Sequence, residues 1–179
     1  SITVPWRIVS DSASAEAFAA KLKATPVAYL RGTSISNILK YSAKYFEDSG
    51  VRSPRRVIDV SGDGPNNIGA PVLPVRDAVL RQGIIINGLP IMLGPSISRS
   101  MGFGLDTYYR DCVIGGPGSF VLPLLKSSDW ATAIRRKLIL EIAGGAVMVI
   151  RTQLQPVIPH ARTTDCLIGE ALRRQWDDG

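Results

Sequence analysis

One uninterrupted apolar strand constrains the fold of this chain more than any other stretch. Residues 83–93 have the composition of a strand, and the run Ile84, Ile85, Ile86 lacks the alternation of apolar and polar residues that a half-exposed strand shows. Continuous apolar runs of this kind are typical of parallel strands that helices cover on both faces. The run therefore predicts an α/β fold.

Strand-like and helix-like stretches alternate on both sides of this run. Such alternation predicts a three-layer α/β domain with a mainly parallel, Rossmann-like sheet and helices on both faces. We expect Ser12 or Ser14 to cap the first helix. The expected strands are 2–9, 56–62, 83–93 and 119–124, and the expected helices are 14–23, 34–47, 71–82, 105–112 and 129–142.

The periodic pattern weakens after residue 143. We divide the chain into a domain at 1–143 and a carboxyl-terminal tail at 144–179 that packs on it. Within the tail we expect a strand at 145–153, a proline-containing linker at 155–164 and a helix at 168–176.

Composition and charge exclude several classes of partner. The net charge is +6, but the basic residues are scattered, and the triplet Arg135, Arg136, Lys137 is interpreted as a solvated helix face. A nucleic-acid site needs aromatic residues interleaved with a basic groove, and none is visible. The apolar run 138–150 is interrupted and is shorter than the roughly 20 residues that span a bilayer. We expect no nucleic-acid partner and no transmembrane segment.

The first residue is Ser1, with no Met and no signal peptide, which suggests a fragment or a processed chain.

The nucleophiles and cysteines give no catalytic motif. Neither GK[ST] nor GxSxG occurs, and the one histidine, His160, lies among prolines. Cys112 and Cys166 are the two cysteines, and two sulfurs with one imidazole are too few for a structural metal site. Two alternatives stay open for them, a disulfide in an oxidising compartment or two inert thiols. We expect no enzyme.

The end of the strand at 56–62 carries the strongest functional signal. Asp59, Ser61 and Asp63 occupy every second position, just before a turn rich in Gly, Pro and Asn. Ligands of open α/β sheets bind at the carboxyl ends of strands. Mg²⁺ and Mn²⁺ prefer hard oxygen ligands from separate loops, and Thr33 and Asp63 could each give one.

Each of these residues also has a purely structural interpretation. Thr33 and Ser34 could cap the helix that follows them, and residues 63–67 could form only a turn. Asp59, if covered, needs hydrogen-bond partners, and backbone N–H groups or an arginine are favoured over a metal.

These motifs resemble the von Willebrand factor type A fold, and in particular a bacterial family of that type whose function is unknown. Thr33 in RGTSISNIL and Asp63 in VIDVSGDG match the second and third elements of its metal-ion-dependent adhesion site. The matching blocks are VPWRIVSD (4–11), RRVIDVSGDGPNN (55–67), GIIINGLPI (83–91), LDTYYRDCVIGGPGSFV (105–121), IRRKLILEIAG (134–144) and DCLIGE (165–170).

The resemblance implies a non-catalytic binding domain that recognises a protein partner through Mg²⁺ or Mn²⁺. Thr33 and Asp63 would be the metal ligands, and Asn66 and Asn67 would shape the neighbouring loop and contact the partner. Family members look exported, which implies a periplasmic or secreted protein, and a bridge between Cys112 and Cys166 would tie the tail to the domain.

One departure from the family pattern concerns its first element, a DxSxS strand that precedes the threonine. Asp11 is followed by Ser12, Ala13, Ser14 and Ala15, so alanines stand where both serines belong. The segment from Asp59 to Asp63 imitates the motif, but it comes after Thr33. We therefore expect a sheet that is incomplete at its amino end, a weak or absent metal site, and marginal stability or self-association through open strand edges.

Two other functions remain as alternatives. Asp59 and Asp63 could be the carboxylate pair of a metal-assisted hydrolase that acts on phosphate esters. The chain could also be a structural remnant without a ligand.

Overall fold

The computed structural model describes residues 2–26, 32–93, 104–143 and 164–177. The chain divides into two compact units, Ser1–Arg31 and Gly32–Gly179. The predicted boundary at residue 143, the strand at 145–153 and nearly all of the linker at 155–164 fall on or beside residues 144–163, which lie outside the described residues.

The first unit contains one helix, α1 (Ser12–Ala24), and no strand among its described residues. Its N-cap is Asp11, so neither Ser12 nor Ser14 is the N-cap residue. The Asp11 carboxylate accepts a 2.8 Å hydrogen bond from the Ser14 amide, and the Ser14 hydroxyl accepts one from the Asp11 amide at 3.1 Å, so Ser14 takes part in a capping box. The strand predicted at 2–9 is wrong as well. Within this unit the segment has no neighbouring strand for its backbone groups, and Ile8 remains 86% exposed.

The second unit is built on two parallel strands, β1 (Arg56–Gly62) and β2 (Ile84–Pro90), with Ile58 opposite Ile86. The strand predicted at 119–124 occurs only as isolated bridges to the region of β2, at Val121 and Leu124. The amides of Leu122 and Leu124 donate to the Gly88 and Pro90 carbonyls, and Pro123 between them has no N–H for a further strand on the other side.

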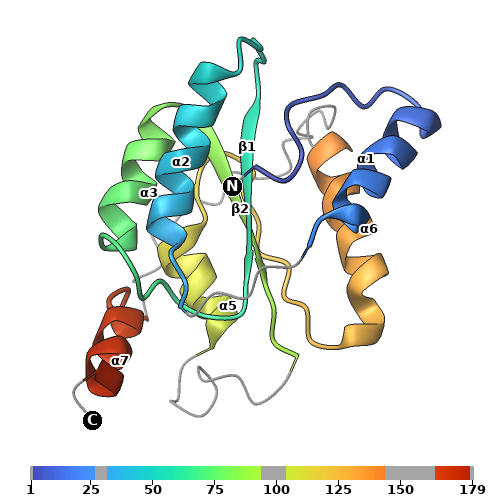
Figure 1. Ribbon diagram of the computed structural model, residues 1–179. Coiled ribbons are helices and arrows are strands. Elements are labelled where there is room, and N and C mark those ends of the chain that lie inside the picture. The colour runs from blue at the N-terminus through green and yellow to red at the C-terminus, as the bar shows by residue number, and fades with distance from the viewer. Residues whose placement is uncertain (1, 27–31, 94–103, 144–163, 178–179) are drawn as a thin grey trace, which may run out of the picture. The chain divides into compact units, whose positions relative to one another are not determined.

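Helices α2 (Ile35–Asp48) and α3 (Val72–Arg81) lie beside each other along the strands (Figure 1). Their apolar stripes follow the helical period and meet the inward residues of the strands, because every second residue of β1 points the same way. The buried core includes Leu39, Val75, Val79, Ile58, Val60, Ile84 and Ile86.

Helix α6 (Trp130–Ala143), which follows the short 3-10 helix η2 (Ser127–Asp129), meets Asp59 of β1 and Asn87 of β2 through its polar side chains. Since Ile58 and Val60 face the core with α2 and α3, Asp59 points to the opposite side of the strand. Helices and parallel strands together give an α/β fold, as the apolar strand predicted.

The segment predicted as a helix at 105–112 forms α5 (Leu105–Tyr108) and then the π-helical turn η1 (Tyr109–Val113). The ring of Tyr109 lies against Gly62 and Gly88, two glycines on the neighbouring strands. A Cβ on Gly88 would stand 2.7 Å from Cδ1 of Tyr109, so only glycine leaves room for this ring.

Within the second unit, a disulfide between Cys112 and Cys166 ties the tail to the η1 turn, which confirms the bridged alternative. Helix α7 (Ile168–Asp177) follows and agrees with the helix predicted at 168–176. Its Gly169 packs so closely on the loop after β1 that an added Cβ would stand 2.0 Å from the Asn66 carbonyl oxygen. Among the described residues no helix has the length and apolar character needed to cross a membrane.

Candidate functional site

Two loops meet at the carboxyl end of β1. One leads into α2 and carries Thr33, and the other follows β1 and carries Asn67 and Ile68. The Thr33 carbonyl accepts hydrogen bonds from the amides of Asn67 (2.8 Å) and Ile68 (3.1 Å), while the Thr33 amide donates to Oδ1 of Asn67 (2.7 Å). The Ser34 hydroxyl donates to the Ile68 carbonyl at 2.9 Å. These reciprocal bonds hold the two loops in one register.

Asn66 stabilises this junction from the protein interior. Its side chain is fully buried, and Oδ1 accepts from the Ser36 amide at 2.9 Å. Its Nδ2 donates to the Ala70 carbonyl (3.2 Å) and to Oε1 of Glu170 in α7 (2.7 Å). A partner cannot reach this buried amide, so the contact expected of Asn66 is not available. Its bonds instead link the loop after β1 to α2 and α7. Asn67 is half-buried at the edge.

The predicted metal ligands Thr33 and Asp63 come from these two loops. Asp63 is exposed, and Gly64 after it lies so close to Thr33 that an added Cβ would stand 3.3 Å from Oγ1. The Thr33 hydroxyl therefore lies beside the residue that follows Asp63. Ser34 is the N-cap of α2, but its side chain makes no capping bond to the helix.

The oxygen atoms of Thr33 and Asp63 are of the kind that binds a divalent cation, but two ligands are too few to complete its coordination. A hydroxyl and a carboxylate are the hard oxygen donors that Mg²⁺ and Mn²⁺ prefer, with water filling the other positions. In the described parts of the chain, no three His, Cys, Asp or Glu side chains gather into a group that could hold a metal. Thr33 and Asp63 would thus supply one part of a coordination shell.

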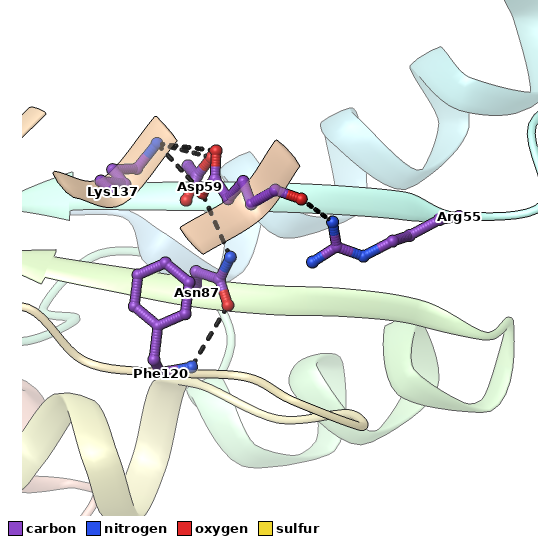
Figure 2. A network of polar contacts seen from close by, with 6 residues as sticks. Arg55, Asp59, Asn87, Phe120 and Lys137 are labelled. Atoms are coloured by element: carbon purple, nitrogen blue, oxygen red, sulfur yellow. Dashed lines mark hydrogen bonds and ion pairs between the residues drawn. The ribbon is translucent and has the colours of Figure 1, made fainter. Parts of the chain in front are cut away.

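Asp59 belongs to a different cluster, in the middle of the sheet (Figure 2). Its Oδ2 lies 2.7 Å from Nζ of Lys137, which also lies 3.2 Å from Oε1 of Glu141. The Lys137 side chain is only 10% exposed, so a solvated helix face was wrong for this residue. The partner of Asp59 is a lysine and not the backbone N–H or arginine that we favoured.

Asn87 and Arg55 complete this cluster. Asn87 donates to Glu141 at 3.2 Å and accepts from the Phe120 amide at 3.2 Å, so it links α6, β2 and the 114–124 segment. The Arg55 guanidinium donates to the Glu141 carbonyl (Figure 2). The cluster fastens α6 to the sheet with polar contacts. Sequence reasoning missed Glu141, although its spacing of four residues from Lys137 is a signal for an ion pair on a helix.

The substitution Glu141→Gln tests the protonation of this cluster. Burial, and then the neighbouring Asp59, raise the pKa of Glu141 above its ordinary value of 4.5. A carboxyl whose pKa is higher in the folded state contributes stability below that ordinary value and loses it as the pH rises through the folded-state pKa. Because the Gln amide cannot ionise, we expect the free energy of unfolding of Glu141→Gln to increase relative to the wild type as the pH rises above 4.5.

Urea unfolding at a series of pH values measures this difference. Glu47→Gln, at an exposed position of α2, is the matched control and should keep the pH dependence of the wild type. If the free energies of unfolding of Glu141→Gln and of the wild type changed in parallel with pH, the raised pKa of Glu141 would be contradicted.

Fold and site together define an α/β protein with a polar loop junction at the carboxyl end of its first parallel strand. The chain belongs to the family described as "Protein of unknown function (DUF1194)", which matches residues 1–146. No curated protein matches it significantly.

Among solved structures, the fold is similar to proximal thread matrix protein 1 from the mussel byssus, with a TM-score of 0.55 and 16% sequence identity. The match covers 70% of this chain and 31% of the mussel chain, so this chain spans less than a third of that protein. At this identity the likeness concerns the fold alone.

Proposed function

We propose that this protein is a non-catalytic binding domain of the von Willebrand A type, which recognises a protein partner through Mg²⁺ or Mn²⁺. Thr33 and Asp63 are the ligands of a metal site that is incomplete in this chain, and Asn67 and the exposed Ile68 form the rim that a partner contacts. Thr33 and Asp63 would hold the cation, which would supply a binding position for an oxygen ligand of the partner. The hydrogen bonds between Thr33 and Asn67 orient the loop after β1, which carries the Asp63 carboxylate at its edge.

One observation carries this proposal, the closeness of the Thr33 hydroxyl to the residue after Asp63. The two ligands come from loops that are about 30 residues apart in sequence, yet paired hydrogen bonds between Thr33 and Asn67 hold these loops together. Rigid loops at the carboxyl ends of parallel strands are the usual ligand sites of open α/β sheets.

The alternative hydrolase needs Asp59 and Asp63 at one reacting centre. Four residues along a strand correspond to about 13 Å, which is too far for two ligands of one ion. Asp59 is, moreover, already paired with the ammonium group of Lys137. These observations favour the binding function over hydrolysis.

The proposal includes a three-layer von Willebrand A-like sheet that is incomplete at its amino end. In the described part of the chain, β2 is the one strand that pairs with β1, so the outer edge of β1 has no partner there. An open edge supports self-association. The Cys112–Cys166 bridge supports an oxidising compartment, and we propose that the protein is periplasmic or secreted.

Thermal unfolding with Mn²⁺ or EDTA tests this function. A ligand that binds only the folded state at ten times its Kd stabilises it by about 1.4 kcal/mol, or roughly 3–6 °C for a chain of this size. We expect the wild type to show such a rise in Tm, and Asp63→Asn to lose it. Asp48→Asn, at an exposed position of α2, is the matched control and should keep it. A wild-type Tm that is the same in Mn²⁺ and EDTA would contradict the proposal.

A further inference from the structure

The outer edge of β1 is a row of backbone groups that have no partner strand among the described residues. In a parallel pair, alternate residues of a strand turn both their N–H and their C=O toward the same neighbour. The Gly62 carbonyl accepts a 2.8 Å hydrogen bond from the Ile91 amide, just beyond the end of β2, so the even-numbered residues of β1 face β2. The backbone groups of Val57, Asp59 and Ser61 therefore point outward, away from β2.

The exposure of β1 agrees with this assignment. Asp59 is exposed as a whole residue although its side chain is only 28% exposed, so much of this exposure belongs to its backbone. Ser61 is exposed as well. Strand β1 runs for seven residues in unbroken register with β2 and contains no proline, so nothing within the strand blocks pairing at its outer edge. The far edge of β2, by contrast, is bonded to the 115–124 segment.

Helix α6 lies over the line between the two strands. Lys137 contacts Asp59 of β1 at 2.7 Å, and Glu141, one turn later, contacts Asn87 of β2 at 3.2 Å (Figure 2). Asp59 and Asn87 are directly paired in the sheet. Neighbouring strands are about 4.8 Å apart, so the axis of α6 is displaced from β1 by about half of this spacing, toward β2.

One flank of α6 is apolar and exposed. Ala133 leans toward β2, where it clusters with Leu124 beyond that strand. Because successive helical residues are about 100° apart, the flank that starts one residue later points to the opposite side, above the outer edge of β1. The exposed side chains of this flank are Ile134 (37%), Leu138 (46%) and Ile142 (79%).

We propose that two copies of this chain pair through the outer edges of β1, antiparallel about a two-fold axis at Asp59, with the apolar flanks of their α6 helices packed against each other. Full overlap of the strands centres the axis on Asp59, the middle residue of β1. Val57, Asp59 and Ser61 of the two copies then exchange about six N–H···O=C bonds. The inference rests on the self-association included in the proposed function and not on the cation.

The position of α6 favours a second copy as the occupant of this edge. Residues directly opposite each other point to the same face of a sheet, so both α6 helices lie on one face of the paired sheet. One strand spacing between the two β1 strands, plus half a spacing on each side, puts the helix axes about 10 Å apart, which is the distance at which packed helices lie. A homodimer buries roughly 800 Å² on each partner, more than one strand edge supplies, and the α6 flank adds apolar surface.

The charges of the strand ends are complementary in the same register. Arg55 lies opposite Asp63 of the second copy, so unlike charges meet at both ends of the paired strands. At the centre the two Asp59 carboxylates face each other, which by itself is unfavourable. Each of them is already paired with the ammonium group of its own Lys137, which offsets this repulsion.

Sedimentation equilibrium of the full, oxidised chain measures the association. We expect a reversible dimer of the wild type. Leu138→Glu places a carboxylate in the apolar flank of α6 and should raise the Kd of the dimer by at least about tenfold, because a charge buried there has no partner. Leu140→Glu is the matched control, since Leu140 is 42% exposed on the opposite side of the same helix, and it should keep the wild-type Kd.

Amide hydrogen exchange locates the contact. The amides of Val57, Asp59 and Ser61 should be protected in the dimer and should lose this protection on dilution and in Leu138→Glu, whereas the Ile58 amide, which faces β2, should stay protected throughout. A monomeric wild type, a dimer in which these three amides exchange freely, or protection that does not change on dilution overturns the inference. A monomer whose Tm still rises with Mn²⁺ overturns this inference alone and leaves the cation-dependent function standing.

Discussion

Replacing Cys112 and Cys166 with alanine is expected to lower the free energy of unfolding by about 4 kcal/mol. The bridge closes a loop with a sequence separation of 54, and the loop-closure estimate gives the largest single contribution that we can assign in this chain. A domain with ordinary stability of 5–15 kcal/mol would lose a large part of it. Urea unfolding of the oxidised wild type and of the double variant measures the difference.

The local consequence of this change is specific. Cys166 leads into α7, whose Glu170 bonds to Asn66 under the candidate site. Amide exchange at Asn66 should therefore speed up in the double variant before the rest of the sheet exchanges. Wild-type protein treated with a reductant should behave as the double variant does, and the double variant itself should not respond to reductant. Equal stability of the variant and the oxidised protein would contradict this account of the tail.

Replacing Asn66 with alanine is expected to cost about 3 kcal/mol. Three groups would lose a partner, the buried Ser36 amide, the Ala70 carbonyl and the half-buried Glu170 carboxylate, and each group left unpaired and buried costs about 1–3 kcal/mol. Asn67→Ala is the matched control on the adjacent residue, and it should cost about 1 kcal/mol because its side chain is half-buried and accepts one bond from Thr33.

Thermal unfolding of both variants in EDTA gives the comparison. Because Asn66 is central to the loop junction, its variant should also respond less to Mn²⁺ than the wild type does. Equal stability losses in the two variants would contradict the supporting role of Asn66.

The elements with strong local patterns were predicted well from the sequence. Strand β1 has the predicted bounds, and α2, α3, α6 and α7 differ from their predictions by one or two residues. Apolar periodicity and end signals are local properties, so the sequence alone contains them. The segment 2–9 failed because strand formation depends on a partner strand, which no local pattern reveals.

The candidate site depends more on tertiary structure. The sequence could place Asp63 at a strand end, but only the resemblance paired it with Thr33. The sequence could not predict the hydrogen bond of Asn66 or the ion pair of Lys137. Their partners, Glu170 and Asp59, are 104 and 78 residues away in sequence.

The central claim, a divalent-cation site formed by Thr33 and Asp63, is tested most directly by locating Mn²⁺ on the protein. In spectra of the ¹⁵N-labelled chain, substoichiometric Mn²⁺ broadens the amide signals nearest to it. We predict that Thr33, Asp63 and Gly64 broaden first, that Arg56 at the far end of β1 is little affected, and that Asp63→Asn abolishes the effect. Broadening centred on Asp59 and Lys137, or broadening that persists in Asp63→Asn, would contradict the claim.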